Sequence, residues 1–207
     1  MACNLLSCFD NLNQIPLNNS NNDDNYILLY GRMMAGKGED VLIKALSILK
    51  DKGIIYRAII CGPSPNKDYP SNLIKFYGLE NQVVYVGPRL GKKLVELINR
   101  SSIVVVPSKY EEMFGQTAIE AMYFGKPVLA SNTGGLAEVV SNFGVLIPPN
   151  DPYALAEAIH ELMSNKNIIE TVGKKAKEYA RSVFDPENYI QKYLKVVLKW
   201  KLLNQVK

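Results

Sequence analysis

The chain has 207 residues, of which 47% are hydrophobic and 21% charged, and this composition excludes the disordered and fibrous classes of protein. Its formal net charge of +4 is too small to indicate a nucleic-acid partner without a clustered basic patch. The three cysteines form no C-x-x-C pair, which argues against a zinc site or a disulfide framework. We therefore expect a cytoplasmic protein with no membrane span.

Along the chain, residues 1–25 come first and are predicted to be a flexible segment, because positions 11–25 are dominated by Asn, Asp, Ser and Gln. Over residues 26–184, apolar runs of strand length alternate with amphipathic stretches of helix length. This alternation is typical of βα units around a parallel sheet. We therefore predict one α/β domain, with a Rossmann-like doubly wound parallel sheet of about six strands.

The predicted strands are short runs rich in Ile, Val, Leu or Tyr. They cover residues 26–30, 54–61, 83–86, 103–106, 128–130 and 145–147. Between the first two, apolar residues recur at helical spacing from Val41 to Leu49, and Gly53 follows where a helix often ends. These features predict one complete βαβ unit.

Three helices are predicted after the last strand, over residues 151–164, 168–182 and 186 to about 203. The last of these, within a C-terminal segment 185–207, is basic and amphipathic. Its lysines are accompanied by two aromatic residues: Lys192, Lys195, Lys199 and Lys201 with Tyr193 and Trp200. The pattern fits either weak peripheral contact with an anionic membrane or a solvated face.

The loop after the first predicted strand, residues 31–38, reads Gly-Arg-Met-Met-Ala-Gly-Lys-Gly and leads into a helix. Glycines let the backbone approach a phosphate, and the amides at a helix N-terminus favour negative charge. Arg32 and Lys37 can neutralise that charge. The loop therefore predicts a diphosphate site, although glycines that shape a turn beside solvated cations would give the same letters.

The same loop matches part of the phosphate-binding motif of ATPases, because Gly31, Gly36 and Lys37 have the spacing G-x-x-x-x-G-K. That motif continues with a Ser or Thr whose hydroxyl binds magnesium, whereas position 38 is glycine. Strand 103–106 also ends in Pro107 rather than a magnesium-binding Asp. Both departures argue against an NTPase.

The second informative loop follows strand 103–106. There Glu112 and Glu120 lie eight positions apart, bracket a Phe-Gly pair and lead into Glu-Ala-Met-x-x-Gly-x-Pro-Val. This stretch resembles the retaining GT-B glycosyltransferases of group 1, the family that includes glycogen synthase-like and mannosyltransferase-like enzymes. Further matches follow the family order: Gly-Arg and Lys-Gly in the first loop, Val86-Gly87, and Gly134-Gly135 with Glu138.

The resemblance implies one half of a GT-B fold, the C-terminal donor domain of a hexosyltransferase that binds a nucleotide diphosphate sugar. It implies that Glu112 contacts hydroxyls of the donor sugar and that Glu120 holds the ribose hydroxyls. Three residues at a helix start, Gly115, Gln116 and Thr117, would meet the donor phosphates, with help from Gly31, Arg32 and Lys37. Retaining enzymes of this family use same-face attack assisted by the leaving phosphate, so neither glutamate is expected to be a nucleophile.

Two alternatives concern the glutamates themselves. Thr117 and Glu120 have the spacing of a helix capping box, so Glu120 could simply cap a helix. Glu112 could be a solvated loop acid like its neighbour Glu111.

The partners are predicted only by class. We expect a nucleotide sugar with no metal or other cofactor, and an acceptor glycan, lipid or protein that the sequence does not identify. Too few residues precede the first strand to form an acceptor domain, so we expect an acceptor-binding domain, a partner or a homo-oligomer to complete the enzyme. The alternative is a stand-alone nucleotide-sugar-binding module without transfer activity.

Overall fold

The computed structural model describes residues 25–34, 36–66 and 68–184. Six strands are present in this part of the chain: β1 (Ile27–Tyr30), β2 (Ala58–Cys61), β3 (Val83–Tyr85), β4 (Ile103–Val106), β5 (Val128–Ser131) and β6 (Val145–Ile147). The helices are α1 (Glu39–Asp51), α2 (Tyr69–Phe76), α3 (Lys92–Arg100), α4 (Gln116–Tyr123), α5 (Gly134–Val140), α6 (Pro152–Met163) and α7 (Lys166–Phe184), with one 3-10 turn, η1 (Ser141–Phe143). None of the described helices is both long and apolar enough to cross a membrane.

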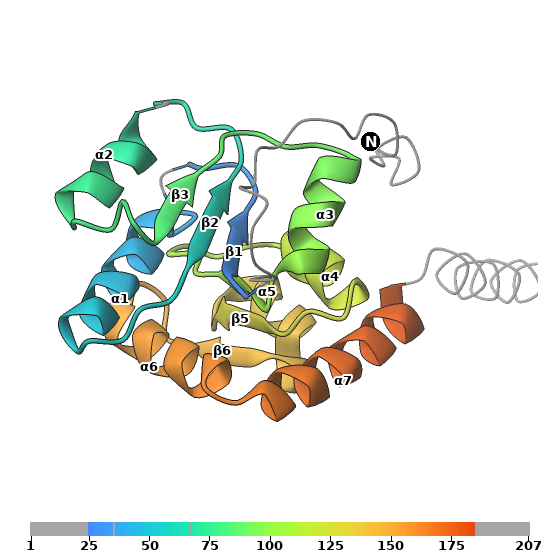
Figure 1. Ribbon diagram of the computed structural model, residues 1–207. Helices are drawn as coiled ribbons and strands as arrows, with labels where there is room; N and C mark the ends of the chain where they lie inside the picture. The colour runs from blue at the N-terminus through green and yellow to red at the C-terminus, as the bar shows by residue number, and fades with distance from the viewer. Residues whose placement is uncertain (1–24, 35, 67, 185–207) are drawn as a thin grey trace, which may run out of the picture.

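The strands form a single sheet in the order β3-β2-β1-β4-β5-β6, and every pairing between neighbours is parallel. The chain builds outward from β1 to β3, then returns to the centre with β4 and builds toward the other edge (Figure 1). This reversal defines a doubly wound sheet, so the predicted Rossmann-like fold class is confirmed.

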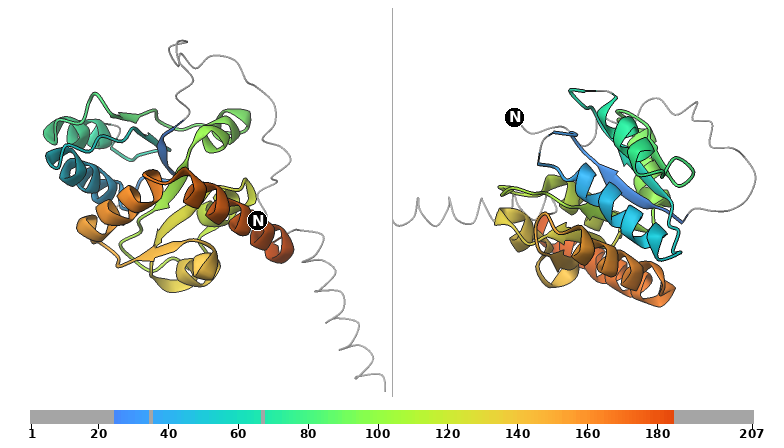
Figure 2. Two further views of the ribbon diagram at one scale, coloured as in Figure 1. Left: turned by 60° about the horizontal axis from the view of Figure 1, so that its bottom comes forward. Right: turned by 90° about the vertical axis from the view of Figure 1, so that its left-hand side faces the viewer.

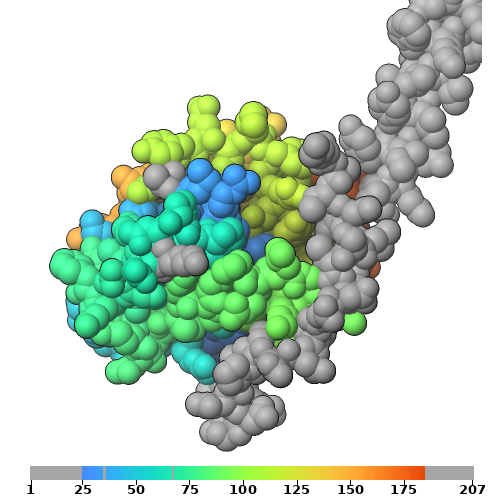
Figure 3. Space-filling model, turned by 90° about the horizontal axis from the view of Figure 1, so that it is seen from above, coloured from blue at the N-terminus to red at the C-terminus, as the bar shows by residue number. Residues whose placement is uncertain are grey.

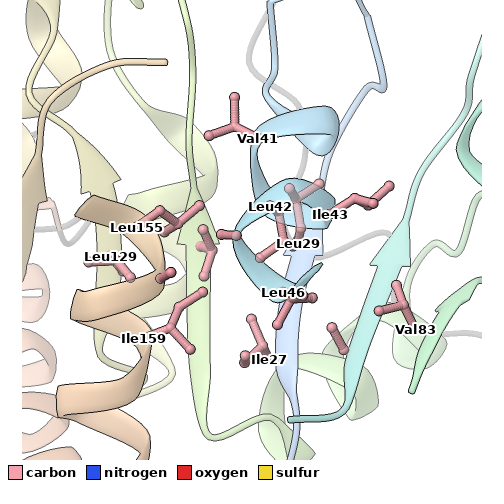
Figure 4. Packing of buried hydrophobic residues seen from close by; sticks show 14 of the residues in the cluster. Ile27, Leu29, Val41, Leu42, Ile43, Leu46, Val83, Leu129, Leu155 and Ile159 are labelled. Carbon is pink, nitrogen blue, oxygen red and sulfur yellow. The ribbon is translucent and has the colours of Figure 1, made fainter. Parts of the chain in front are cut away.

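Helices cover both faces of the sheet, as two views of the ribbon show (Figure 2). On one face, α1 and α6 pack against each other and against the sheet, where Leu42, Leu46 and Ile159 are fully buried. Figure 4 shows Leu42 and Leu46 of α1 beside Ile27 and Leu29 of β1. On the other face lie α3, α4, α5 and most of α7. All four residues of β1, β2, β4 and β5 are buried, as expected for strands covered on both sides.

One predicted strand, 54–61, is wrong over its first half, because β2 begins only at Ala58. Strand residues need partners, and the neighbouring strands β1 and β3 begin their pairing with β2 at Ile27 and Val83, both opposite Ala58. Residues 54–57 have no such partner, and Ile55 is 68% exposed. Here the apolar run crosses the edge of the sheet and continues into the connection from α1.

The remaining boundaries are close to those predicted. Gly53 lies directly beyond the end of α1 with φ of 77°, which confirms it as the glycine that ends this helix. Helix α7 begins two residues before the predicted 168 and continues to Phe184. The predicted flexible segment, apart from Asn25, and the predicted basic helix at 186–203 lie outside the described residues.

The loop between β1 and α1 packs tightly against the end of β4. Gly38 precedes α1 with φ of 83°, and a Cβ atom built on it would lie 1.9 Å from the carbonyl oxygen of Pro107. No side chain fits in that space. Glycine at position 38 therefore sets how closely the first loop approaches the second.

We predict that Gly38→Ala lowers the free energy of unfolding by about 2 to 4 kcal/mol, because the new methyl group clashes with backbone. Gly53→Ala is the matched control. Its φ of 77° is similar, but no described atom lies within 4 Å of the place that its Cβ would take. The control should therefore lose only about 1 to 2 kcal/mol of unfolding free energy, the cost of placing alanine in the left-handed region. Urea unfolding measures both variants, and equal losses would contradict the close packing.

Candidate functional site

The two central strands diverge at their carboxyl ends, because β1 leads to α1 on one face of the sheet and β4 leads to α4 on the other. Doubly wound sheets bind ligands at such a point. A small cavity of about 40 Å³ lies there, called the switch-point cavity below. Its walls include five of the predicted site residues: Gly31, Arg32, Lys37, Glu112 and Thr117.

Figure 3 views the molecule from the edge at which the strands end. The β1–α1 loop, in blue, lies between the β2–α2 loop in teal and the β4–α4 loop in yellow-green. Residues far apart in the sequence thus meet at one edge, as the predicted alternation of strands and helices requires.

An ion pair joins the two informative loops. The Nζ of Lys37 donates to Oε1 of Glu112 at 2.6 Å, and the hydroxyl of Ser108 donates to the same oxygen. The Glu112 side chain is only 15% exposed, whereas that of Lys37 is 41% exposed. Glu112 is therefore an anchored carboxylate with two donors, and the alternative of an ordinary solvated loop acid does not fit this geometry.

Glu120 is linked to the switch-point cavity by Tyr30, which lines the cavity and contacts the Glu120 carboxylate. The Tyr30 hydroxyl donates to the carbonyl of Thr117 at 3.0 Å and to Oε2 of Glu120 at 3.4 Å. Burial raises the pKa of the Glu120 carboxyl, and the hydrogen bond from Tyr30 opposes that shift. Burial also raises the pKa of the Tyr30 hydroxyl, with a further contribution from the charge of Glu120.

The capping-box alternative for Glu120 is wrong. Helix α4 begins at Gln116 with Gly115 as its N-cap, so Thr117 lies inside the helix rather than at its cap. No side-chain hydrogen bond caps this helix. The amides of Gly115, Gln116 and Thr117 lie at the helix start, as predicted, and are available to a ligand or water at the carboxyl edge.

Arg32, the second cation of the first loop, forms no ion pair with a carboxylate among the described residues. Arg32 is exposed, and the contact that its guanidinium makes is with the sulfur of Met34, at 3.9 Å between Nη1 and Sδ. Together with Lys37, it places two positive charges beside the switch-point cavity. Such a pair suits a multiply charged anion.

Position 38 also bears on the ATPase alternative. The hydroxyl-bearing residue of that motif would need a side chain whose Cβ lies only 1.9 Å from the Pro107 carbonyl oxygen. The loop geometry therefore excludes a Ser or Thr at this position without movement of backbone. Among the described residues, no group of three or more His, Cys, Asp or Glu side chains is suited to hold a metal ion.

Sequence reasoning missed two residues that hold the glutamates in place, Tyr30 and Ser108. Both lie at the carboxyl ends of central strands, where polar side chains of this fold gather. A tyrosine that ends a buried strand needs a partner for its hydroxyl, and this requirement was the available signal. Nothing in the sequence indicates the identity of that partner, 90 residues away in the chain.

The short helix α5 also reaches this site. A Cβ on Gly135 would lie 2.0 Å from the carbonyl oxygen of Met113, so the helix start packs directly on the β4–α4 loop. Glu138, part of the family match, lies in the second turn of this helix and is exposed, because the helix begins at Gly134.

The chain is similar to known proteins in sequence. Residues 10–181 match the model of a family described as Glycosyl transferases group 1. The D-inositol 3-phosphate glycosyltransferase of Corynebacterium glutamicum is 34% identical over 164 residues, which are 75% of this chain and 39% of that protein. The chain thus spans well under half the length of this relative.

Solved structures confirm the predicted fold, one half of a GT-B architecture. HepE of Anabaena, in complex with UDP, matches with a TM-score of 0.75 and 27% identity over 85% of this chain and 49% of its own. The C-terminal domain of a group 1 family glycosyl transferase from Francisella tularensis matches with a TM-score of 0.67 over 78% of this chain and 87% of its own. At 23% identity, the second likeness concerns the fold alone.

The raised pKa of Glu120 predicts a specific pH dependence. Because the native state holds this proton more tightly than the unfolded chain does, the ionised carboxylate lowers stability once the pH rises through the folded pKa. Below the unfolded value of 4.5 this cost is absent. We therefore expect the stability of Glu120→Gln, relative to wild type, to be greater near pH 7 than near pH 4.

Urea unfolding at the two pH values measures this difference. The exposed Glu178→Gln is the control and should show a smaller change between them. A relative stability of Glu120→Gln that falls as the pH rises would contradict the burial of this carboxyl.

Proposed function

The chain belongs to the glycosyl transferases group 1 family, and we propose that it is the donor-binding half of a retaining hexosyltransferase. In this proposal a nucleotide diphosphate sugar binds at the switch-point cavity, and the hexosyl group passes to an acceptor. The observation that carries the proposal is the meeting of Lys37 and Glu112 between the ends of β1 and β4. A cation for the diphosphate and a carboxylate for sugar hydroxyls then lie within one small site.

The diphosphate would be held by charge and by backbone amides together. Lys37 and Arg32 supply the cations, and the start of α4 at Gly115 and Gln116 supplies amides with the positive end of a helix dipole. Charge-assisted hydrogen bonds of this kind contribute about 1.5 to 3 kcal/mol each. Two cations and a helix start are enough to bind a diphosphate without a metal, and we propose that none is required.

Donor binding would exchange the partners of Lys37. In the free chain its ammonium group is paired with Glu112, an interaction that costs little to break because Lys37 is 41% exposed. When the ammonium turns to a phosphate, Glu112 keeps the hydrogen bond from Ser108 and has lone pairs free for sugar hydroxyls. The same movement thus neutralises the phosphate and exposes the sugar-binding carboxylate.

Glu120 would accept hydrogen bonds from the two ribose hydroxyls. The Tyr30 hydroxyl contacts Oε2 and so fixes the orientation of the whole carboxylate, including Oε1. A vicinal diol presents two donors at the spacing of the two carboxylate oxygens. Ribose hydroxyls would also supply the donors that this partly buried carboxylate otherwise obtains only from Tyr30.

The chemical role proposed for this half is stabilisation of the leaving group. As the glycosidic bond breaks, negative charge accumulates on the departing diphosphate, and fixed cations and amides stabilise that charge most in the transition state. Glu112 is anchored by Lys37 and Ser108 and is assigned no bond to carbon. We assign the acceptor proton to the leaving phosphate, with attack from the same face.

The acceptor would be bound with the help of a further domain or partner. The Corynebacterium relative and HepE are each more than twice as long as the part that this chain matches. Apolar side chains are also exposed at the rim of the carboxyl edge, with Met113 97% and Tyr110 69% exposed. A surface of this kind suits a covering domain. The alternative is a binding module without transfer activity, and sugar transfer on addition of an acceptor-binding domain would exclude it.

Calorimetric titration with UDP, GDP and ADP tests the donor site. We expect one nucleotide to bind saturably. Lys37→Ala should lower the affinity for this nucleotide by about tenfold to a hundredfold, because one charge-assisted contact is lost. Lys44→Ala is the matched control, since Lys44 lies on the exposed face of α1. Equal affinities of the two variants would contradict a diphosphate at Lys37.

The role of Glu112 is tested by comparing the nucleotide that binds with its glucose conjugate. Glu112→Gln should lower the affinity for the conjugate by about tenfold. The affinity for the nucleotide alone should be unchanged or higher, because Lys37 loses a competing partner. Glu111→Gln changes the adjacent exposed residue and should alter neither affinity. A parallel loss for nucleotide and conjugate would remove Glu112 from the sugar site.

A further inference from the structure

A second and larger cavity, of about 350 Å³, lies on the other side of the β1–α1 loop. It is formed where the starts of α1 and α2 face each other across the loops that follow β1 and β2. Met33 borders both cavities, so one loop separates this second cavity from the switch-point cavity. Its volume is within the range of about 300 to 1,000 Å³ found for small-molecule sites.

The unusual feature of the second cavity is Glu39, a buried acidic residue that lines it. Glu39 is only 4% exposed, and its Oε2 has no hydrogen-bond partner in the described structure. Buried polar groups in proteins are almost always paired. An oxygen without a partner loses the hydrogen bonds it had in water, so it is an exception that needs a physical cause.

Two cations near the first loop are paired with other carboxylates in the described structure. Lys109 is paired with Asp40 at 2.8 Å, and Lys37 is paired with Glu112 at 2.6 Å. Asp40 and Glu39 both lie in the first turn of α1, where the helix dipole favours negative charge. The dipole offsets part of the cost for Glu39 but supplies no hydrogen-bond donor to Oε2. Burial raises the pKa of the Glu39 carboxyl, and the nearby charge of Asp40 adds to the shift. A hydrogen bond from the backbone at Glu39 and the charge of Lys109 oppose it.

The other residues that line the cavity indicate which kind of ligand could pair with this carboxylate. Met33, Met34 and Pro65 are apolar, Tyr69 is aromatic and 40% exposed, and Asn66 provides an amide. Asp40 and Lys109 also line the cavity and neutralise each other as an ion pair. A divalent metal ion is not favoured, because the described residues contain no set of three His, Cys, Asp or Glu side chains that would ligate it. An organic cation does fit, since an ammonium group can donate to the carboxylate while its carbon skeleton packs on the methionines and the tyrosine.

We propose that the second cavity binds a small organic amine of about amino-sugar size, with its ammonium group on Glu39. The proposal is independent of the donor site, since it uses none of the residues assigned there.

Methyl NMR of the full chain labelled at methionine tests this proposal. The probe is glucosamine, and glucose is its neutral isostere. We expect glucosamine to shift the methyl signals of Met33 and Met34 saturably, while that of Met122, a fully buried residue of α4, stays in place. Glucose should shift neither to the same extent, because it offers no charge to Glu39.

The variant Glu39→Gln keeps the shape of the side chain and removes its charge. We expect the affinity for glucosamine to fall at least about tenfold in this variant and to be retained in Glu157→Gln, an exposed glutamate on α6. Equal binding of glucosamine by Glu39→Gln and wild type, equal binding of glucose and glucosamine by wild type, or no saturable shift would each overturn the proposal. The wild-type comparison of the two sugars decides the question even if the variant does not fold.

A titration of the same sample with UDP keeps the two proposals distinguishable. Glucosamine binding without UDP binding would support the amine site alone and leave the donor assignment to be judged on its own test.

Discussion

The whole site depends on how closely the β1–α1 loop packs against the end of β4. Gly38 faces the Pro107 carbonyl at a distance that no side chain permits. The amide of Lys109 donates to the Gly36 carbonyl at 2.7 Å, and its ammonium group pairs with Asp40. These contacts hold together two loops that lie about 70 positions apart in the chain, and they place Lys37 within reach of Glu112. Without this packing, the charged residues would be separate surface groups.

Much of this arrangement follows from sequence pattern alone. Alternation of apolar runs with amphipathic stretches requires parallel strands, and parallel strands bring their following loops to one edge. Strand order is a different matter, because nothing in the composition of β1 and β4 shows that they are neighbours. The error at residues 54–57 has the same origin. An apolar run marks a buried segment, but only pairing with Ile27 and Val83 decides where β2 begins.

The parts of the site that were not predicted are contacts between side chains distant in sequence. The partners of Glu112 and Glu120, namely Ser108 and Tyr30, are fixed by the direction in which each side chain leaves its strand or helix. A sequence identifies which groups need partners, whereas only packing selects them. The buried carboxylate of Glu39 illustrates the limit, since at the start of a helix an acidic residue is usually exposed and needs no explanation.

The first loop has opposite electrostatic character on its two sides. Lys37 is directed to the switch-point cavity, whereas Glu39, two residues later, borders the second cavity. Gly38 between them allows the chain to turn sharply into α1. The end of the loop therefore places a cation at one cavity, and the first residue of α1 places an acidic residue at the other. The most direct test of the donor site is a crystal structure of the chain with UDP bound. We predict a diphosphate between Lys37 and the start of α4, with the ammonium group moved from Glu112 to a phosphate oxygen. A diphosphate bound elsewhere, or a Lys37–Glu112 pair still intact beside it, would contradict this assignment.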